Sequence, residues 1–238
     1  MPEKKSYLPV LMYHRIVKSK KETGKHNIYV TEKRFRKQMI WLKKKQLSTI
    51  TFREIAENPA ISFENKIILT FDDGYVDNYS LLFPILKEFG FTAVVFLVTQ
   101  QKNNSWGVKE GEPSIDLLTN GQILEMDQYG IEFGSHTQNH VNLHLCDKNT
   151  LHQEIAGSRK EIEALLNKKV VSFCYPFGGV NEDIKRIVKE AGYTFGISTN
   201  TGPLNFYDDL FQIRRIEVSC RTLLYRFKKK AGGNYYKK

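Results

Sequence analysis

The hydrophobic and polar positions of this chain alternate between two kinds of segment. Short, nearly continuous apolar runs are typical of strands buried on both faces, and runs with apolar residues three or four positions apart are typical of helices. The predicted strands are residues 8–13, 67–71, 92–98, 131–133, 170–175, 194–198 and 212–218. The predicted helices are residues 31–45, 77–90, 119–129, 149–167 and 182–191, followed by a last basic helix near the C-terminus.

Capping residues support several of these boundaries. Thr31, Asp77 and Ser219 stand where an N-cap oxygen is expected, and Gly90 and Gly192 stand where a helix commonly ends. The polar stretch 99–118 lacks either periodicity and predicts a long loop.

Strands that alternate with helices predict parallel β-α units. About seven such units predict an α/β fold, a closed or nearly closed (β/α) barrel, in which chemistry takes place at the carboxyl ends of the strands. The 238 residues contain no repeat and no Gly/Ser- or Pro-rich linker, so we expect a single domain over residues 1–238.

The net charge of +10 is unevenly distributed. Residues 15–45 hold 12 Lys/Arg and 2 acids, residues 214–238 hold 9 and 1, and residues 46–213 hold 13 and 22. Basic blocks of this kind can face an anionic surface, although a solvated helix face and a frayed tail give the same pattern. No nucleic-acid-reading module is recognisable, so nucleic acid is not an expected partner.

The N-terminal residues indicate where the protein is found. No apolar run is long enough to span a bilayer, and the polar start lacks the order of an export signal. The sequence therefore predicts a cytoplasmic protein, although a chain trimmed of its signal would have the same sequence pattern and be extracellular or at the cell surface.

Three widely spaced cysteines argue against a disulfide framework and a cysteine-based zinc site. The oligomeric state is left open.

Polar residues follow four of the predicted strands, where a barrel places its chemistry. Asp72 and Asp73 follow the strand 67–71, His136 and His140 follow the strand 131–133, and His14 follows the strand 8–13. The fourth run is Tyr-Pro-Phe-Gly at 175–178. Taken singly, each has an ordinary structural explanation: a turn, a loop or a structural histidine.

Taken together, these residues have the composition of a catalytic metal site. Two histidines and one carboxylate leave a coordination position open, which distinguishes catalytic from structural sites, and a spacing of four lets two imidazoles meet one ion on a helical turn. A divalent ion lowers the pKa of water from about 16 to about 7. A second carboxylate can then accept a proton, and a further histidine can donate one.

Two of these runs, TFDDG at 70–74 and HTQNH at 136–140, resemble the first two motifs of the polysaccharide deacetylases with NodB homology, carbohydrate esterase family 4. The resemblance extends from Leu8 to about Val218. It implies a distorted NodB-like (β/α) barrel and a zinc-like divalent ion, with cobalt or nickel as alternatives.

The resemblance also implies roles for individual residues. Asp73, His136 and His140 would be the metal ligands, and Asp72 would be the general base. The backbone N–H of Phe177 would help to stabilise the oxyanion, a role that depends little on the side chain.

The chain departs from the common family pattern at two positions. Cys174 stands where an arginine usually orients the base, and no histidine follows His152 where the usual general acid lies. The start LMYHRI at 11–16 resembles the branch that deacetylates poly-N-acetylglucosamine in biofilms, in which the catalytic histidine comes from the first strand. His14 is then the expected acid, and Arg215, at the end of a late strand, is the expected source of the missing guanidinium; Arg214 should face the other side.

The implied function is metal-dependent removal of N-acetyl groups from an N-acetylglucosamine-containing glycan by a metal-activated water. The glycan is left open among biofilm polymer, peptidoglycan, lipid-linked sugar and chitin oligomers. The alternative is a catalytically weak carbohydrate-binding relative, which Cys174 and the missing C-terminal histidine would favour.

Overall fold

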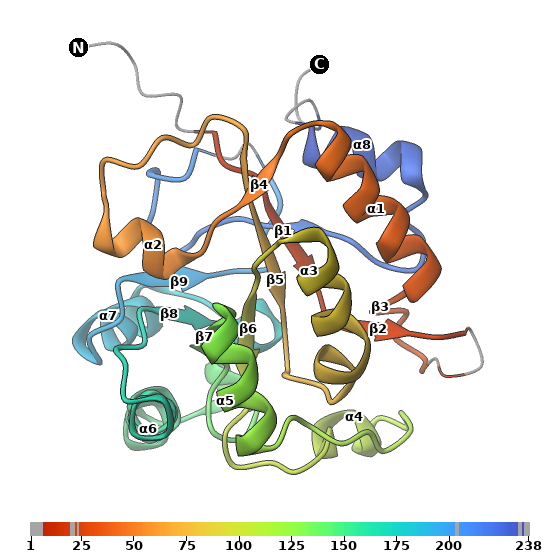
Figure 1. The fold of residues 1–238 in the computed structure, drawn as a ribbon. Helices are drawn as coiled ribbons and strands as arrows, with labels where there is room; N and C mark the ends of the chain where they lie inside the picture. The colour runs from red at the N-terminus through yellow and green to blue at the C-terminus, as the bar shows by residue number, and fades with distance from the viewer. Residues whose placement is uncertain (1–6, 20–21, 23, 203–204, 233–234, 236–238) are drawn as a thin grey trace.

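A computed structural model describes residues 7–19, 22, 24–202, 205–232 and 235 of the chain (Figure 1). Its main sheet has the strand order β10-β1-β5-β6-β7-β8-β9, with β4 also beside β5, and every pairing between these strands is parallel. The strands are β1 (Val10–Tyr13), β4 (Ser48–Thr49), β5 (Lys66–Phe71), β6 (Val94–Leu97), β7 (Glu132–Ser135), β8 (Ser172–Cys174), β9 (Phe195–Ile197) and β10 (Ile216–Glu217). A separate parallel pair joins β2 (Arg15–Val17) and β3 (Tyr29–Thr31).

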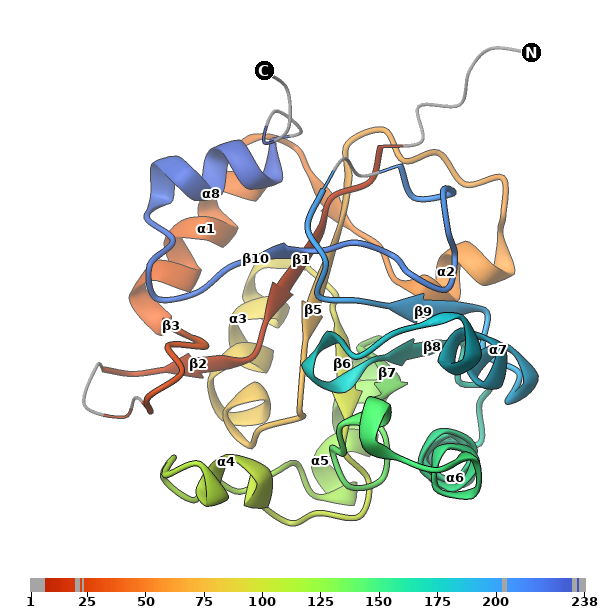
Figure 2. The same cartoon turned by 180° about the vertical axis from the view of Figure 1, so that it is seen from behind.

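Helices surround the sheet (Figures 1 and 2). They are α1 (Glu32–Lys44), α2 (Phe52–Glu57), α3 (Phe83–Phe89), α4 (Ser105–Lys109), α5 (Asn120–Tyr129), α6 (Lys148–Leu166), α7 (Glu182–Glu190) and α8 (Leu224–Ala231). Short helical turns at Asn78–Leu82, Leu143–Leu145 and Pro176–Gly178 complete the elements in the described part of the chain. No helix among these residues is both long and apolar enough to cross a membrane.

The sheet curls into a nearly closed barrel because the segment between β9 and β10 crosses from one sheet edge to the other. Ile213 donates its N–H to the carbonyl of Gly196 at 2.8 Å, and the carbonyl of Ile213 accepts the N–H of Ser198 at 2.9 Å. Three residues later the chain pairs with β1, where Leu11 lies beside Ile216. The predicted α/β barrel of about seven strands is therefore confirmed: seven strands lie along the continuous path of the described sheet.

Alternate side chains of each strand enter two different cores. Val10, Ile68 and Val94 belong to a cluster inside the barrel, which Phe52 and Phe206 help to fill. The alternate residues of the strands pack outward under the helices; these include Leu11, Leu69, Val95, Phe133 and Phe173. Because both faces are covered, the strands read as continuous apolar runs in the sequence.

Several local predictions were wrong. The stretch 99–118 contains α4, and the sequence pattern did not indicate β2, β3, β4 or α2. Asp77 precedes a helical turn but does not cap it, because its carboxylate instead binds Arg15 and the N–H of Ile16. The last basic helix begins at Leu224 rather than after Ser219.

Two other expectations are untested by the fold. The polar start at residues 1–6 and the end of the basic tail lie outside the described residues, so the localisation stays a prediction. The single-domain organisation over residues 1–238 also stays a prediction.

Candidate active site

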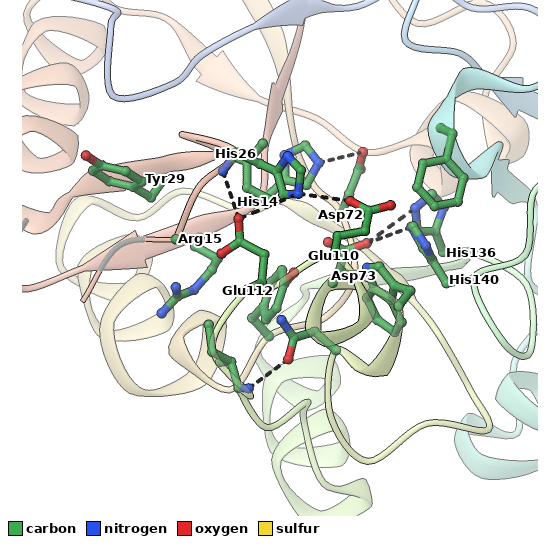
Figure 3. Close-up of a pocket in the computed structure, with 18 of the residues that line it drawn as sticks. His14, Arg15, His26, Tyr29, Asp72, Asp73, Glu110, Glu112, His136 and His140 are labelled. Carbon is green, nitrogen blue, oxygen red and sulfur yellow. Dashed lines mark hydrogen bonds and ion pairs between the residues drawn. The ribbon is translucent and has the colours of Figure 1, made fainter. Parts of the chain in front are cut away.

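A pocket of about 390 Å³ opens where the carboxyl ends of the central strands meet (Figure 3). The residues that line it include six of the seven predicted site residues: His14, Asp72, Asp73, His136, His140 and Phe177. The seventh, Arg215, is fully buried below the pocket and contacts Asp72. One pocket thus gathers side chains from β1, β5 and β7 and from the loop after β8.

The predicted metal ligands converge on one point. Asp73 Oδ1 lies 3.3 Å from His140 Nε2 and 3.5 Å from His136 Nε2, and all three residues are buried. Donors about 2.0–2.1 Å from a tetrahedral zinc ion would be separated by about 3.3–3.4 Å. Within the described structure Asp73 Oδ1 has no hydrogen-bond donor. This buried, unsatisfied oxygen between two imidazoles fits a divalent cation.

The protein holds His136 in the orientation that a ligand needs. Its Nδ1 lies 2.7 Å from the carbonyl oxygen of Cys174, so Nε2 is left to face Asp73. Burial is the main cause that lowers the pKa of His136, to about 4. The imidazole is therefore neutral at neutral pH, as a metal ligand must be.

The second histidine lies on a loop rather than on the expected helical turn. Thr137 has φ +67° and His140 has φ +55°, and the Thr137 hydroxyl accepts the N–H of His140 at 2.9 Å. The carboxylate of Glu154 on α6 accepts the N–H groups of Gln138 and Asn139, both at 2.9 Å. Glu154 was not predicted, although it belongs to the buried stripe of its helix and could have been noticed as a carboxylate among apolar residues.

Aromatic rings enclose His140. The ring of Trp106 stacks on it at 4.3 Å between centroids and 22° between planes, and the ring of Phe177 meets it edge-on at 4.6 Å. His140 Nδ1 is buried and has no hydrogen-bond partner among the described residues. Ring packing therefore restrains this imidazole where a hydrogen bond restrains His136.

Asp72 forms a buried ion pair with Arg215. Arg215 donates from Nη1 to Oδ1 at 2.6 Å and from Nη2 to Oδ2 at 2.8 Å, the two-pronged geometry of strong Arg–carboxylate pairs. Burial alone would raise the pKa of Asp72, but the charge and hydrogen bonds of Arg215 hold this pKa below its ordinary value. Asp72 is therefore an ionised acceptor with a fixed orientation.

The position of Arg215 differs from the expectation in one respect. It precedes β10 instead of ending a strand, on the segment that crosses the barrel. Its guanidinium also donates to Thr70 Oγ1 at 3.0 Å, to the carbonyl of Ser198 at 2.9 Å and to Cys174 Sγ at 3.1 Å. The small side chain of Cys174 thus contacts the guanidinium where the common family pattern has an arginine of its own. Arg214 is exposed, as the alternation predicted.

His14 directly follows β1 and faces the other side of the same carboxylate. Its Nε2 lies 3.8 Å from Asp72 Oδ2, and its side chain is 20% exposed toward the pocket. Asn78 donates to the backbone carbonyl of His14 at 3.0 Å, which fixes the end of the strand. The His14 imidazole therefore lies beside the Asp72 carboxylate and faces the open pocket.

Phe177 occupies a strained backbone position at the rim of the pocket. Its φ is +56°, in the left-handed region that L-residues seldom adopt. Its side chain is 56% exposed. Strain of this kind is common at ligand-binding sites, but the oxyanion role of its N–H stays a prediction.

The remaining wall of the pocket was not predicted. His26 Nε2 lies 2.9 Å from Glu110 Oε2 and 3.7 Å from Glu112 Oε1, so the segment before β3 and the end of α4 meet beside the predicted site residues (Figure 3). Arg15 adds a second link by pairing with Asp77 at 2.8 Å. These contacts join segments that are far apart in the sequence, so no local sequence pattern predicts them.

Comparisons with known proteins identify the family of this chain. The family model described as polysaccharide deacetylase matches residues 62–196. YxkH, a polysaccharide deacetylase homologue of Bacillus subtilis, is 30% identical over 91% of this chain and 73% of its own length. The poly-β-1,6-N-acetyl-D-glucosamine N-deacetylase of Staphylococcus aureus is 25% identical over 81% of this chain and 69% of its own length.

A solved structure shows the same architecture. The Streptococcus pyogenes deacetylase PplD, in complex with acetate, superposes with a TM-score of 0.81 and 26% identity over 94% of this chain and 97% of its own. The family model covers more than half of the sequence, and the similarity to YxkH covers most of both chains. This chain belongs to the polysaccharide deacetylase family.

Proposed function

We propose that this protein removes acetyl groups from the N-acetylglucosamine residues of a polysaccharide, with a divalent ion, preferentially zinc, held by Asp73, His136 and His140. The main supporting observation is that two adjacent carboxylates face one pocket with different partners. Asp73 Oδ1 lies against two imidazoles and has no hydrogen-bond donor among the described residues, whereas Asp72 is bound by a guanidinium.

In the proposed reaction, a water oxygen is added to the acetyl carbon and the amide C–N bond breaks, which yields acetate and a free amine. A divalent ion at this site would supply Lewis acidity, polarising the acetyl carbonyl and making a water molecule more acidic. Asp72 accepts the proton of the attacking water, because Arg215 keeps it ionised and pointed toward the pocket.

The leaving amine needs a proton, since an amide anion is a very poor leaving group. His14 is proposed to donate it, from the side of Asp72 that faces the pocket. The N–H of Phe177 is proposed to donate a hydrogen bond to the oxyanion of the tetrahedral intermediate.

The alternative, a catalytically weak carbohydrate-binding relative, was based on two departures from the family pattern. Cys174 replaces the usual arginine, but the guanidinium at Asp72 comes from Arg215. The C-terminal histidine is missing, but His14 provides an imidazole beside the same carboxylate. Neither departure leaves Asp72 without a partner, so the catalytic proposal is preferred.

The choice of N-acetylglucosamine is supported by the Staphylococcus aureus relative, whose name states that substrate, and acetate is the ligand named for PplD. The test is acetate release from β-1,6-linked N-acetylglucosamine oligomers, chitin oligomers and peptidoglycan fragments. The protein is first stripped with a chelator and then reloaded with zinc, cobalt or nickel, with the Asp72→Asn variant as the inactive control.

We expect acetate release that requires a metal and is highest with N-acetylglucosamine oligomers. Release from none of these glycans with any of the three ions would contradict the proposal. Acetate release from peptidoglycan fragments alone would support the proposed reaction. It would show that oligomers of N-acetylglucosamine alone are not the substrate.

A further inference from the structure

The two basic segments of the sequence lie side by side in the fold. The ring of Trp41 on α1 meets that of Phe227 on α8 edge-on, with 5.9 Å between centroids, and both views of the fold show these helices adjacent (Figures 1 and 2). Two helices from these basic segments, α1 and α8, thus lie side by side although they are far apart in the sequence. The catalytic mechanism uses neither helix.

The outward side of α1 is a stripe of cations with one apolar residue. Positions 33, 37, 40 and 44 follow the helical repeat, and they hold Lys33, Lys37, Ile40 and Lys44, all of which are exposed. Among the described residues, no carboxylate lies within ion-pair distance of these three lysines. The nearby Glu32 and Glu88 are both bound to Arg36 instead.

The outward side of α8 has the same mixed character. Phe227 and Ala231 are buried, while Tyr225, Arg226, Lys228 and Lys229 are exposed. Leu223, directly before the helix, is 45% exposed, and Ile40 and Tyr225 are each 55% exposed. We call these nine residues, Lys33, Lys37, Ile40, Lys44, Leu223, Tyr225, Arg226, Lys228 and Lys229, the α1–α8 face.

We propose that the α1–α8 face docks the protein onto an anionic lipid bilayer. Its cations complement acidic headgroups, and its three α1 lysines have no acidic partner among the described residues. The apolar side chains favour a bilayer over a soluble polyanion. Ile40 and Leu223 can enter the boundary between headgroups and acyl chains, and a tyrosine suits that boundary, whereas a soluble polyanion offers only charge.

Docking by this face would leave the catalytic pocket accessible, because none of the nine residues lines it. The proposal therefore does not depend on the proposed reaction. Acetate release from soluble oligomers can be measured on each variant as a check of the fold that is independent of lipid binding.

The test is cosedimentation of the whole protein with vesicles of phosphatidylglycerol or of phosphatidylcholine. We expect binding to phosphatidylglycerol that weakens as salt is added, and little binding to phosphatidylcholine. Since each cation near an anionic membrane contributes about fivefold in affinity, Lys33→Gln/Lys37→Gln/Lys44→Gln should weaken binding on the order of a hundredfold.

The matched control is Lys148→Gln/Lys160→Gln/Lys189→Gln, which removes the same charge from exposed lysines on α6 and α7. Its affinity for vesicles should stay near that of the unmodified protein. Equal loss in both triple variants would show that net charge, and not this face, controls binding, and would overturn the proposal.

A third variant, Ile40→Ser/Leu223→Ser/Tyr225→Ser, separates lipid from soluble polyanions. It should weaken vesicle binding but leave binding to polyphosphate unchanged. Undiminished vesicle binding by this variant would favour a soluble polyanion, and equal binding of the unmodified protein to both lipids would reject an anionic bilayer.

Discussion

The two halves of the proposed catalytic pocket are assembled from different parts of the chain. The metal half, Asp73, His136 and His140, follows β5 and β7 and lies entirely within the region that the family model matches. The proton-transfer half is centred on Asp72 but takes His14 and Arg215 from outside that region, near the two ends of the chain. One half comes from the middle of the sequence, and the other is completed by its ends.

The strand order explains how the ends reach the site. β1 lies between β5 and β10, so a strand from the start of the chain adjoins both the middle strand that carries Asp72 and the last strand. Because β1 and β10 pair in the sheet, residues close to each end of the sequence are neighbours there, and the guanidinium of Arg215 reaches Asp72 from beside β10. A functional group can therefore change its position in the sequence while keeping its place at the site.

The two halves also differ in whether their carboxylate is paired with a positively charged side chain. Among the described residues, Asp73 Oδ1 is buried without a hydrogen-bond donor and would be neutralised by a bound cation, whereas the Asp72 carboxylate is paired with Arg215. Removal of metal should therefore affect the first half and leave the ion pair of the second intact. The predictions below test this division.

The largest effect is expected in the metal half. His136→Ala removes one of three ligands and should lose bound metal, and activity should fall by about 10³-fold or more, since a metal supplies several kcal/mol of transition-state stabilisation. Metal content after desalting and acetate release are the measurements. His144→Ala, on an exposed turn nearby, is the control and should keep both. Full metal content in His136→Ala would show that the ligands are misassigned.

Substitution of the base should separate the two halves. Asp72→Asn removes the proton acceptor and should lose about 10²–10⁴ in kcat while it retains metal. Asp73→Asn should lose metal as well as activity. If both variants lose metal equally, the two carboxylates do not have separate roles and the comparison between the halves fails.

His14→Ala tests the part of the proton-transfer half that comes from the first strand. Loss of a positioned acid should reduce kcat for the amide by about 10²–10⁴ with metal content unchanged. An acetyl ester with a good leaving group needs little protonation and should be hydrolysed almost normally. His152→Ala, an exposed histidine on α6, is the control. Equal loss with ester and amide would assign His14 a structural role.

The smallest loss of activity is expected from Arg215→Met, and this loss should shrink as the pH rises. Without the guanidinium, burial would raise the pKa of Asp72, and an opposite charge typically shifts a carboxyl pKa by about 1–3 units. The acid limb of the kcat/KM profile should therefore move to higher pH by a similar amount, with activity regained as pH rises. Arg214→Met, at an exposed position, should leave the profile unchanged.

A second substitution sharpens this test. Cys174→Arg in the Arg215→Met background returns a guanidinium from β8, where the common family pattern has it, and should move the acid limb part of the way back. An unshifted acid limb in Arg215→Met would show that the guanidinium does not control the ionisation of Asp72.

The sequence by itself determined the features that depend on neighbouring residues. Apolar runs such as 67–71 indicated buried parallel strands, and the polar residues that follow them, Asp72, Asp73, His136 and His140, indicated a catalytic metal site. The deacetylase activity was implied by the resemblance of their motifs to a known family. These signals are local because a strand and the residue at its end are consecutive in the chain, and the barrel places those ends together.

The tertiary structure decided everything that depends on which strands are neighbours. Only the order β10-β1-β5 places Arg215 and His14 against Asp72, and only the packing of α4 and the loop after β8 places Trp106 and Phe177 around His140. Asp77 shows the same limit, because the distant Arg15 binds the carboxylate that local pattern assigned to a helix cap. Such contacts join residues far apart in sequence, so their partners are chosen by the folded topology and leave no periodic signal in the chain.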